Sequence, residues 1–198
     1  MSAKGEDSDT EKLIKDTAKK VFFKEGRFNA TTQEIADAAG VNRTLINYYF
    51  RSRDNLFNLV FEDAQKKEDE RIHALVFSDM PLKRKIEMFL DEFFTQAKEY
   101  PYLEIYMVTQ MNQGSCYEDA EAMSRLLDKM YLEIAIEMDK GNVARMRPEQ
   151  FMLNMISLTS FPVSMRPLLE QSMGFSTEQF DKLLEERKEI ILNMLFIN

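Results

Sequence analysis

One stretch of twenty residues decides the fold: Thr31-Thr-Gln-Glu-Ile-Ala-Asp-Ala-Ala-Gly-Val-Asn-Arg-Thr-Leu-Ile-Asn-Tyr-Tyr-Phe50. Thr31 and Glu34 have the spacing of a capping box, in which each side chain accepts the backbone N–H of the other at a helix start. Gly40 suits the left-handed conformation that ends a helix, and Asn42 can cap the next one. The stretch therefore predicts two short helices joined by a tight turn, which is the pattern of a helix-turn-helix.

The second of these helices has two different sides. Ile46 and Phe50 recur at helical spacing and turn one side inward. The opposite side carries hydrogen-bonding residues, and in a helix-turn-helix this side enters the DNA major groove. Asn47 can read a base edge, whereas tyrosine hydroxyls and Arg53 can contact phosphates. The residues expected to contact DNA are Thr31, Thr32, Asn42, Arg43, Thr44, Asn47, Tyr48, Tyr49 and Arg53.

The alternative is that these polar residues form the solvated face of an ordinary helix pair. Three further features weigh against it. Ala36 is small enough for a second helix to cross closely, Val41 fills the corner, and Gly40 ends the first helix. Because they coincide with the polar face, the DNA-binding interpretation is favoured.

Residues 10–64 resemble the DNA-binding domain of TetR-type (tetracycline-repressor-like) transcriptional regulators. The elements that carry the resemblance are Glu25-Gly26 after a leading helix, Thr31-Thr32 before Ile35-Ala36, then Gly40-Val41, Tyr49-Phe50 and Ser52-Arg53-Asp54-Asn55-Leu56. The family usually has lysine where Arg53 stands, which keeps the charge. It often has tyrosine where Asn47 stands, so the phosphate contact usual there is lost or replaced by a base contact.

The resemblance implies a function and an architecture. The function is a sequence-specific regulator of a double-stranded DNA operator, taken as a repressor that a small apolar effector releases. The fold is all-α: a three-helix domain over residues 9–55, then a helical bundle over 56–198 for effector binding and dimerisation, with about nine helices in total. A linker helix over about 53–77 joins the two domains, and the expected location is the cytoplasm.

The charge distribution agrees with this division. The whole chain carries −8 at neutral pH. Residues 10–60 hold nine Lys/Arg and six Asp/Glu, a net of +3, whereas residues 61–198 hold 16 and 25, a net of −9. A basic head on an acidic body is expected of a DNA-binding protein. Because +3 is a weak attraction, useful affinity requires two heads in a homodimer.

Proline, glycine and capping residues place the remaining helices. A helix with Ile14, Ala18, Val21 and Phe22 on one side should follow a disordered tail over 1–8 and end at Gly26. Others are expected from Ser52 to about Phe77, after Pro81, from Pro101 to near Gly114, from about Glu118 to Lys140, from Pro148 with a break or kink at Pro162 and Pro167, and from the capping box Ser176–Gln179.

The body should supply a dimer seam and an effector pocket. In the resembled family two C-terminal helices pair across a two-fold axis. The alternative for the apolar residues of these helices is internal core. The expected seam residues are Phe151, Met155, Leu158, Leu183, Leu184, Arg187, Ile191 and Met194. The pocket, for which ordinary core packing is again the alternative, should use adaptable methionine and aromatic side chains: Phe93, Phe94, Tyr102, Tyr106, Met107, Met111, Met123, Tyr131 and Met155.

Other classes of protein find little support. The chain has one cysteine, Cys116, with no basic residue within eight positions in the sequence, so we expect an inert thiol in a reducing compartment. His73 stands among acids with no partner Cys or His at ligand spacing, so no metal, cofactor or catalytic residue is expected. No apolar run is long enough for a membrane span. The remaining rival is a helical adaptor that binds other proteins and not DNA.

Overall fold

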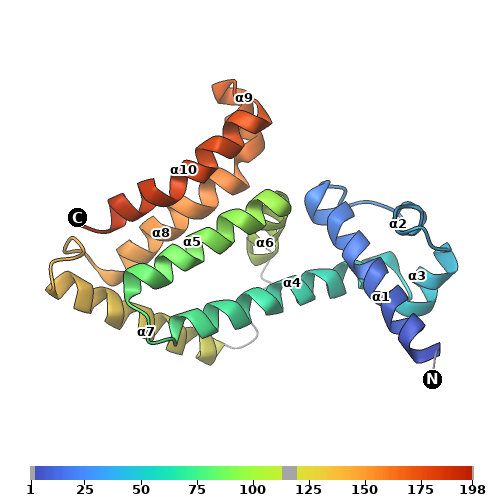
Figure 1. Cartoon of the computed structure of the whole chain (residues 1–198), viewed down its shortest axis with the longest axis horizontal. Helices are drawn as coiled ribbons and strands as arrows, with labels where there is room; N and C mark the ends of the chain where they lie inside the picture. The colour runs from blue at the N-terminus through green and yellow to red at the C-terminus, as the bar shows by residue number, and fades with distance from the viewer. Residues whose placement is uncertain (1–2, 113–119, 198) are drawn as a thin grey trace. The chain divides into compact units, whose positions relative to one another are not determined.

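The computed structural model describes residues 3–112 and 120–197, and in these ranges the chain is helical with no strand. The all-α prediction is confirmed (Figure 1). The described ranges contain ten α-helices and one π-helix, where about nine helices were expected. The bounds are α1 Ala3–Lys19, η1 Lys20–Lys24, α2 Thr32–Ala39, α3 Arg43–Phe50, α4 Arg53–Val76, α5 Leu82–Glu99, α6 Leu103–Asn112, α7 Ala120–Asp139, α8 Pro148–Ser164, α9 Arg166–Met173 and α10 Thr177–Leu195.

Contacts divide the chain into two units. The head comprises Met1–Glu70 together with Tyr100–Leu103, and the body comprises Arg71–Glu99 and Glu104–Asn198. The part of α4 up to Glu70 belongs to the head, and its beginning packs on the end of the first helix: the ring centroids of Phe22 and Phe57 lie 4.7 Å apart. The division at residue 70 therefore comes later in the chain than the boundary at residue 55 that the sequence suggested.

The head has a core built on α1. The expected apolar stripe of Ile14, Ala18, Val21 and Phe22 is buried throughout, as predicted. The start of the helix was predicted wrongly, because α1 already begins at Ala3 and residues 3–8 are not a disordered tail. Consequently Ser8 lies inside the helix.

The end of the first helix widens into the π-helix η1, which the sequence did not reveal. The Glu25 N–H donates to the carbonyl of Lys20 at 3.0 Å, five residues earlier. The carbonyl of Phe23 accepts the N–H of Tyr102 at 3.0 Å, so a segment far along the chain is bonded to this turn. Short π-segments often lie at functional sites.

Tyr102 covers the glycine that follows η1. Gly26 has a φ of +70°, and a Cβ atom there would lie 2.9 Å from the Tyr102 ring. The same ring meets Phe28 edge-on at 6.3 Å. Tyr102 therefore packs in the head, which corrects its expected place in an effector pocket.

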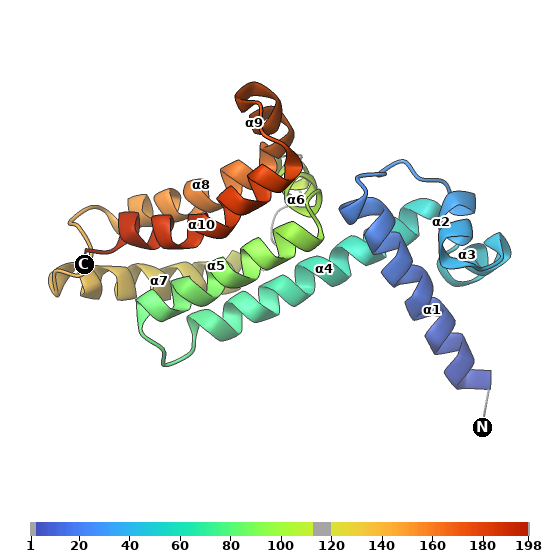
Figure 2. The ribbon, with the colours of Figure 1, turned by 45° about the horizontal axis from the view of Figure 1, so that its top comes forward.

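In the body, α8 and α10 run side by side and α5 packs against both (Figures 1 and 2). The main core joins apolar residues of α5, α7, α8 and α10 with the C-terminal Phe196. Ile86 and Leu90 of α5 are buried in this core. A smaller cluster forms around Ala97, Val163, Phe180 and Leu184.

One buried charge fixes three helices of the body. Lys85 on α5 is 2 % exposed, and its Nζ donates to the carbonyl of Val76 at 2.7 Å. It also bonds both carboxylate oxygens of Glu133 on α7, at 2.7 and 2.9 Å. The ammonium thus satisfies the C-terminal end of α4 while neutralising a partly buried carboxylate. Such a pair is costly to break because the remaining charge is left buried.

Helix ends agree with the sequence wherever a local signal sets them. Ser52 accepts the Asn55 N–H at the start of α4, and Ser176 and Gln179 form the expected capping box of α10. Pro162 lies inside α8 without ending it, and the break falls at Met165 before Pro167. Gly114, Cys116 and Glu118 lie outside the described residues.

The described part of the chain contains neither a membrane span nor a metal cluster. None of the helices described is both long and apolar enough to cross a bilayer. Within residues 3–112 and 120–197, no three His, Cys, Asp or Glu side chains gather as a metal would require. His73 stacks on Phe77 with ring centroids 4.5 Å apart.

Candidate DNA-binding face

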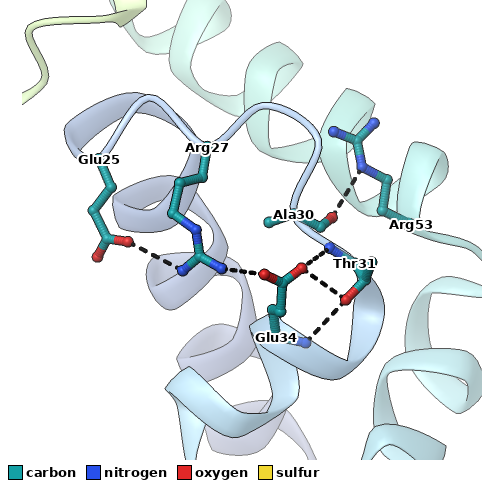
Figure 3. Close-up of polar contacts among 6 residues, drawn as sticks. All are labelled: Glu25, Arg27, Ala30, Thr31, Glu34 and Arg53. Atoms are coloured by element: carbon teal, nitrogen blue, oxygen red, sulfur yellow. Dashed lines mark hydrogen bonds and ion pairs between the residues drawn. The ribbon is translucent and has the colours of Figure 1, made fainter.

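The N-terminus of α2 carries the predicted capping box (Figure 3). The Glu34 N–H donates to Thr31 Oγ1 at 3.3 Å, and the Thr31 N–H donates to Glu34 Oε2 at 2.8 Å. Arg27 adds an ion pair, with Nη2 2.5 Å from Glu34 Oε1. The bonds from the Thr31 backbone and hydroxyl, followed by that from Arg27, lower the pKa of Glu34. The cap is therefore built around an ionised carboxylate.

The turn into α3 follows the sequence signals closely. Gly40 adopts the left-handed conformation, with φ 67° and ψ 29°. Asn42 is the N-cap of α3, and its Oδ1 accepts the Thr44 N–H at 2.9 Å and the Thr44 hydroxyl at 2.7 Å. Both side chains are thus engaged in organising the start of α3, in addition to the DNA contacts expected of them.

The two sides of α3 are disposed as predicted. Ile46 and Phe50 are buried, whereas Arg43, Asn47 and Tyr48 are exposed. An exposed row of hydrogen-bonding groups on the second helix of a helix-turn-helix is what base readout requires.

Arg43 is held by the neighbouring helix. Its Nε donates to the Thr32 hydroxyl at 3.1 Å, from the start of α3 to the start of α2. A guanidinium fixed through Nε still has its terminal nitrogens for a bidentate contact, the geometry that suits guanine. Thr32 and Arg43, both expected at the DNA, are brought together here.

The residue after α3 adopts an unusual backbone. Arg51 has φ 66° and ψ −44°. Among the described residues it is the only one other than glycine with a positive φ. The Ser52 N–H bonds the Phe50 carbonyl at 2.7 Å, so Arg51 occupies the centre of a strained γ-turn. In the sequence, Arg51 stands out only by its positive charge, and no neighbouring residue indicates this turn.

Arg53 is partly structural. Its Nε donates to the Ala30 carbonyl at 3.4 Å (Figure 3), and its Nη1 lies 2.9 Å from Asp54. The guanidinium also lies over the rings of Phe22 and Phe57, at 5.3 and 4.9 Å. The side chain expected to bind phosphate therefore also stabilises the packing of α4 on the head.

Tyr49 has a partner that the sequence did not suggest. Its hydroxyl donates a hydrogen bond to the carboxylate of Asp7 on α1. This bond is the largest cause of a rise in the pKa of Tyr49 to about 12, because the carboxylate stabilises the protonated phenol. The Tyr48 ring meets the Tyr49 ring edge-on at 5.0 Å.

The expected seam residues fall into two groups. Phe151, Met155, Leu184 and Ile191 are buried in the core of their own subunit, so they are not available to a second chain, which corrects that prediction. Leu183 and Met194 are exposed, and Leu158 is partly buried. Arg187 donates from Nη2 to the Leu158 carbonyl at 2.8 Å, a bond that ties α10 to α8.

The expected pocket residues are spread over the core clusters and the helices α6 and α7. Phe93 and Phe94 pack against the core clusters, and Met155 lies within the main one. Tyr106, Met107, Met111, Met123 and Tyr131 are half-buried on α6 and α7.

A groove of about 280 Å³ lies between α5 and α10. Phe94 is the residue that lines it among those expected in the effector pocket. Its other lining residues are Leu90, Asp91, Thr95, Lys98, Asp181, Leu184, Glu185 and Lys188. Ion pairs Lys98–Glu185 (2.8 Å) and Lys188–Asp91 (2.7 Å) cross it, so its rim is charged where an apolar lining was expected.

Comparison with known proteins supports the sequence resemblance. Residues 14–60 match the family model described as bacterial regulatory proteins, tetR family. No curated protein matches the chain.

Solved structures share the fold over almost the whole chain. A TetR/AcrR-family regulator from Thermobifida fusca aligns with a TM-score of 0.60 at 16% identity, covering 93% of this chain and 97% of that one. HlyIIR, a hemolysin II transcriptional regulator, gives 0.58 at 19% identity, covering 97% and 99%. A TetR-family regulator from Pectobacterium atrosepticum gives 0.54 at 16%, covering 98% and 97%. Residues 14–60 are thus similar to the bacterial regulatory proteins of the tetR family, and the chain shares its fold with solved TetR-family transcriptional regulators.

Proposed function

We propose that this protein is a sequence-specific DNA-binding transcriptional regulator that acts as a homodimeric repressor. The observation that carries the proposal is the exposed face of α3, where Arg43 and Asn47 project from a helix-turn-helix whose inward residues are buried. Thr32 supports Arg43 in this role, because its hydroxyl accepts the Nε–H of the guanidinium. Phosphate contacts are assigned to the tyrosine hydroxyls and, alongside its structural role, to Arg53.

Dimerisation is assigned to exposed apolar residues of α8 and α10. On α10, Leu183, Ile190 and Met194 recur at seven- and four-residue spacing and are 38%, 39% and 64% exposed. On α8, Leu153 and Ile156 are 55% and 48% exposed. Apolar side chains left in water on two packed helices favour burial against a second copy.

Release from DNA is assigned to a small apolar effector that binds the body. Half-buried methionine and tyrosine side chains on α6 and α7 support this assignment, since such groups adapt to apolar compounds. Effector binding would favour a spacing of the two heads that no longer matches the operator half-sites. A thermal-shift screen with apolar compounds tests it: a compound that stabilises the protein should also weaken its binding to DNA, and no stabilising compound would argue against an apolar effector.

The experiment that tests the DNA-binding function is selection of bound fragments from source DNA. We expect a two-fold-symmetric motif whose binding weakens steeply as salt rises, because phosphate contacts release counterions. No enrichment over random DNA would favour the rival function, a helical adaptor that binds proteins.

A further inference from the structure

The first turns of α1 reach the DNA-reading helix through one polar contact. The hydroxyl of Tyr49, near the end of α3, donates to the carboxylate of Asp7, 42 residues earlier in the chain. Tyr49 is one of the residues to which a phosphate contact is assigned, and its neighbour Tyr48 is 64% exposed. The contact therefore lies at the edge of the face that is expected to meet the DNA backbone.

A tyrosine hydroxyl has one proton to donate. While Asp7 accepts that proton, Tyr49 can offer an incoming phosphate only its oxygen lone pairs, which repel an anion. The carboxylate adds a negative charge beside the same position. A carboxylate and a phosphate oxygen are both anionic acceptors, so Asp7 is bonded to Tyr49 as a DNA phosphate would be.

We propose that Asp7 is an autoinhibitory residue, whose carboxylate occupies the phosphate-binding hydroxyl of Tyr49 in the free protein and must be displaced by DNA. The inference rests on the proposed DNA-binding function. It gives a role to the acidic start of the chain, where residues 1–9 carry a net charge of −2 ahead of a basic segment. Displacement requires only the start of α1 to move, and helix ends open more readily than helix centres.

Two simpler roles for Asp7 give different expectations. If the contact only fastens α1 to α3, its removal destabilises the head and weakens DNA binding. If Asp7 acts only through long-range repulsion of phosphates, any nearby acid has the same effect. Asp9 is the matched control for the second case, because it is an exposed aspartate two residues away.

The experiment measures the affinity of full-length variants for a short random-sequence duplex at low salt, where sequence-independent phosphate contacts dominate. The variants are Asp7→Ala, Asp9→Ala, Tyr49→Phe and the double variant Asp7→Ala/Tyr49→Phe, because alanine removes the acceptor that an asparagine amide oxygen would keep. We expect Asp7→Ala to bind about fivefold more tightly than Asp9→Ala, the effect of about one hydrogen bond. In the Tyr49→Phe background the gain in affinity from Asp7→Ala should fall to the gain from Asp9→Ala.

The inference is overturned by any of three results. Equal gains for Asp7→Ala and Asp9→Ala would show a general charge effect, and a gain that persists without the Tyr49 hydroxyl would show another route. Weaker binding by Asp7→Ala, with a lower thermal unfolding midpoint, would show a fastening role. If the parent protein does not bind the duplex at low salt, the proposed DNA-binding function itself fails, which is a distinguishable outcome.

Discussion

Glu34 shows how one residue can make the stability of the head depend on pH. Its pKa is lowered from the ordinary value of 4.5, first by the backbone N–H of Thr31, then by the Thr31 hydroxyl and Arg27. A carboxylate whose folded pKa is depressed stabilises the fold above its unfolded pKa, and this contribution is lost as pH falls through the folded pKa. The cap of α2 should therefore weaken only on acidification below 4.5.

We expect Glu34→Gln to be less stable than the parent at neutral pH, because the amide keeps the Thr31 contact but loses the charge that pairs with Arg27. The difference should shrink towards zero as the parent's Glu34 becomes protonated. Urea unfolding followed by circular dichroism at a series of pH values measures it. Asp37→Asn, which removes a charge near the other end of α2, should not lower stability at neutral pH. A gap between Glu34→Gln and the parent that is constant with pH would contradict the assignment.

Base reading and phosphate binding should separate at two further residues. Asn47→Ala should relax the preference at one base position, because only an exposed side chain of α3 is removed. Arg53→Lys should leave the preference unchanged, since the charge stays. Arg53→Ala should weaken binding to all sequences and also lower stability, through the lost contacts with Phe22 and Phe57. Binding-site selection with each variant measures this, and identical profiles for Asn47→Ala and Arg53→Ala would refute the division of roles.

At the scale of single residues, the sequence was informative where partners are near in the chain. Thr31 with Glu34 and Asn42 with Thr44 are bonded as their spacing suggested. The contact between Asp7 and Tyr49 could not be predicted in this way, because nothing in either local sequence specifies a partner 42 positions away.

At the scale of secondary-structure elements, the turn between η1 and α2 packs against the ring of Tyr102, which lies far along the chain. Gly26 and Gly40 have nearly the same backbone, with φ of +70° and +67°. A Cβ atom would meet the Tyr102 ring at 2.9 Å on Gly26, but no described atom within 4 Å on Gly40. The two glycines thus separate the cost of backbone strain from the cost of a clash.

We expect Gly40→Ala to lower the free energy of unfolding by about 1 kcal/mol, the cost of a left-handed alanine. Gly26→Ala should cost more, since the Tyr102 ring must also move. In a Tyr102→Ala background the excess should disappear and the backbone cost should remain. Chemical denaturation of the four variants measures both effects, and equal costs at the two glycines would show that the ring does not press on Gly26.

Helix ends were predictable because capping and helix-breaking residues act within one turn. The division of α8 from α9 was only partly predictable, because the helix continues through Pro162 and ends at Met165. The π-turn η1 and the bond of Lys85 to Glu133 depend on segments that meet only after folding. Propensity and periodicity carry no information about such pairs.

At the scale of the whole molecule, half of the residues first expected at the dimer interface are buried in the core, so the interface is now expected at exposed apolar residues of α8 and α10. We expect Met194→Glu to convert the proposed dimer to a monomer, because a carboxylate would be buried against the partner. Light scattering after size-exclusion chromatography measures the mass. Leu132→Glu on α7 is the matched control, since Leu132 is 59% exposed and Met194 is 64% exposed. A dimer that survives Met194→Glu but not Leu132→Glu would place the interface on α7.

Loss of the dimer should weaken DNA binding. With a net of +3 over residues 10–60, one head is a weak ligand for a polyanion, and two linked heads gain from effective concentration. The monomeric variant should therefore lose more affinity for a two-fold-symmetric site than for a single half-site.

The segment Tyr100–Leu103 packs with the head although α5 and α6 on either side of it belong to the body. The DNA-reading unit is for this reason not a continuous stretch of chain. A fragment ending within α4 would lack the Tyr102 ring that covers Gly26 and meets Phe28. A chimera that contains the complete head would therefore need two separate segments of this sequence. A chimera joined at α4 alone would leave Gly26 and Phe28 without the ring that packs on them.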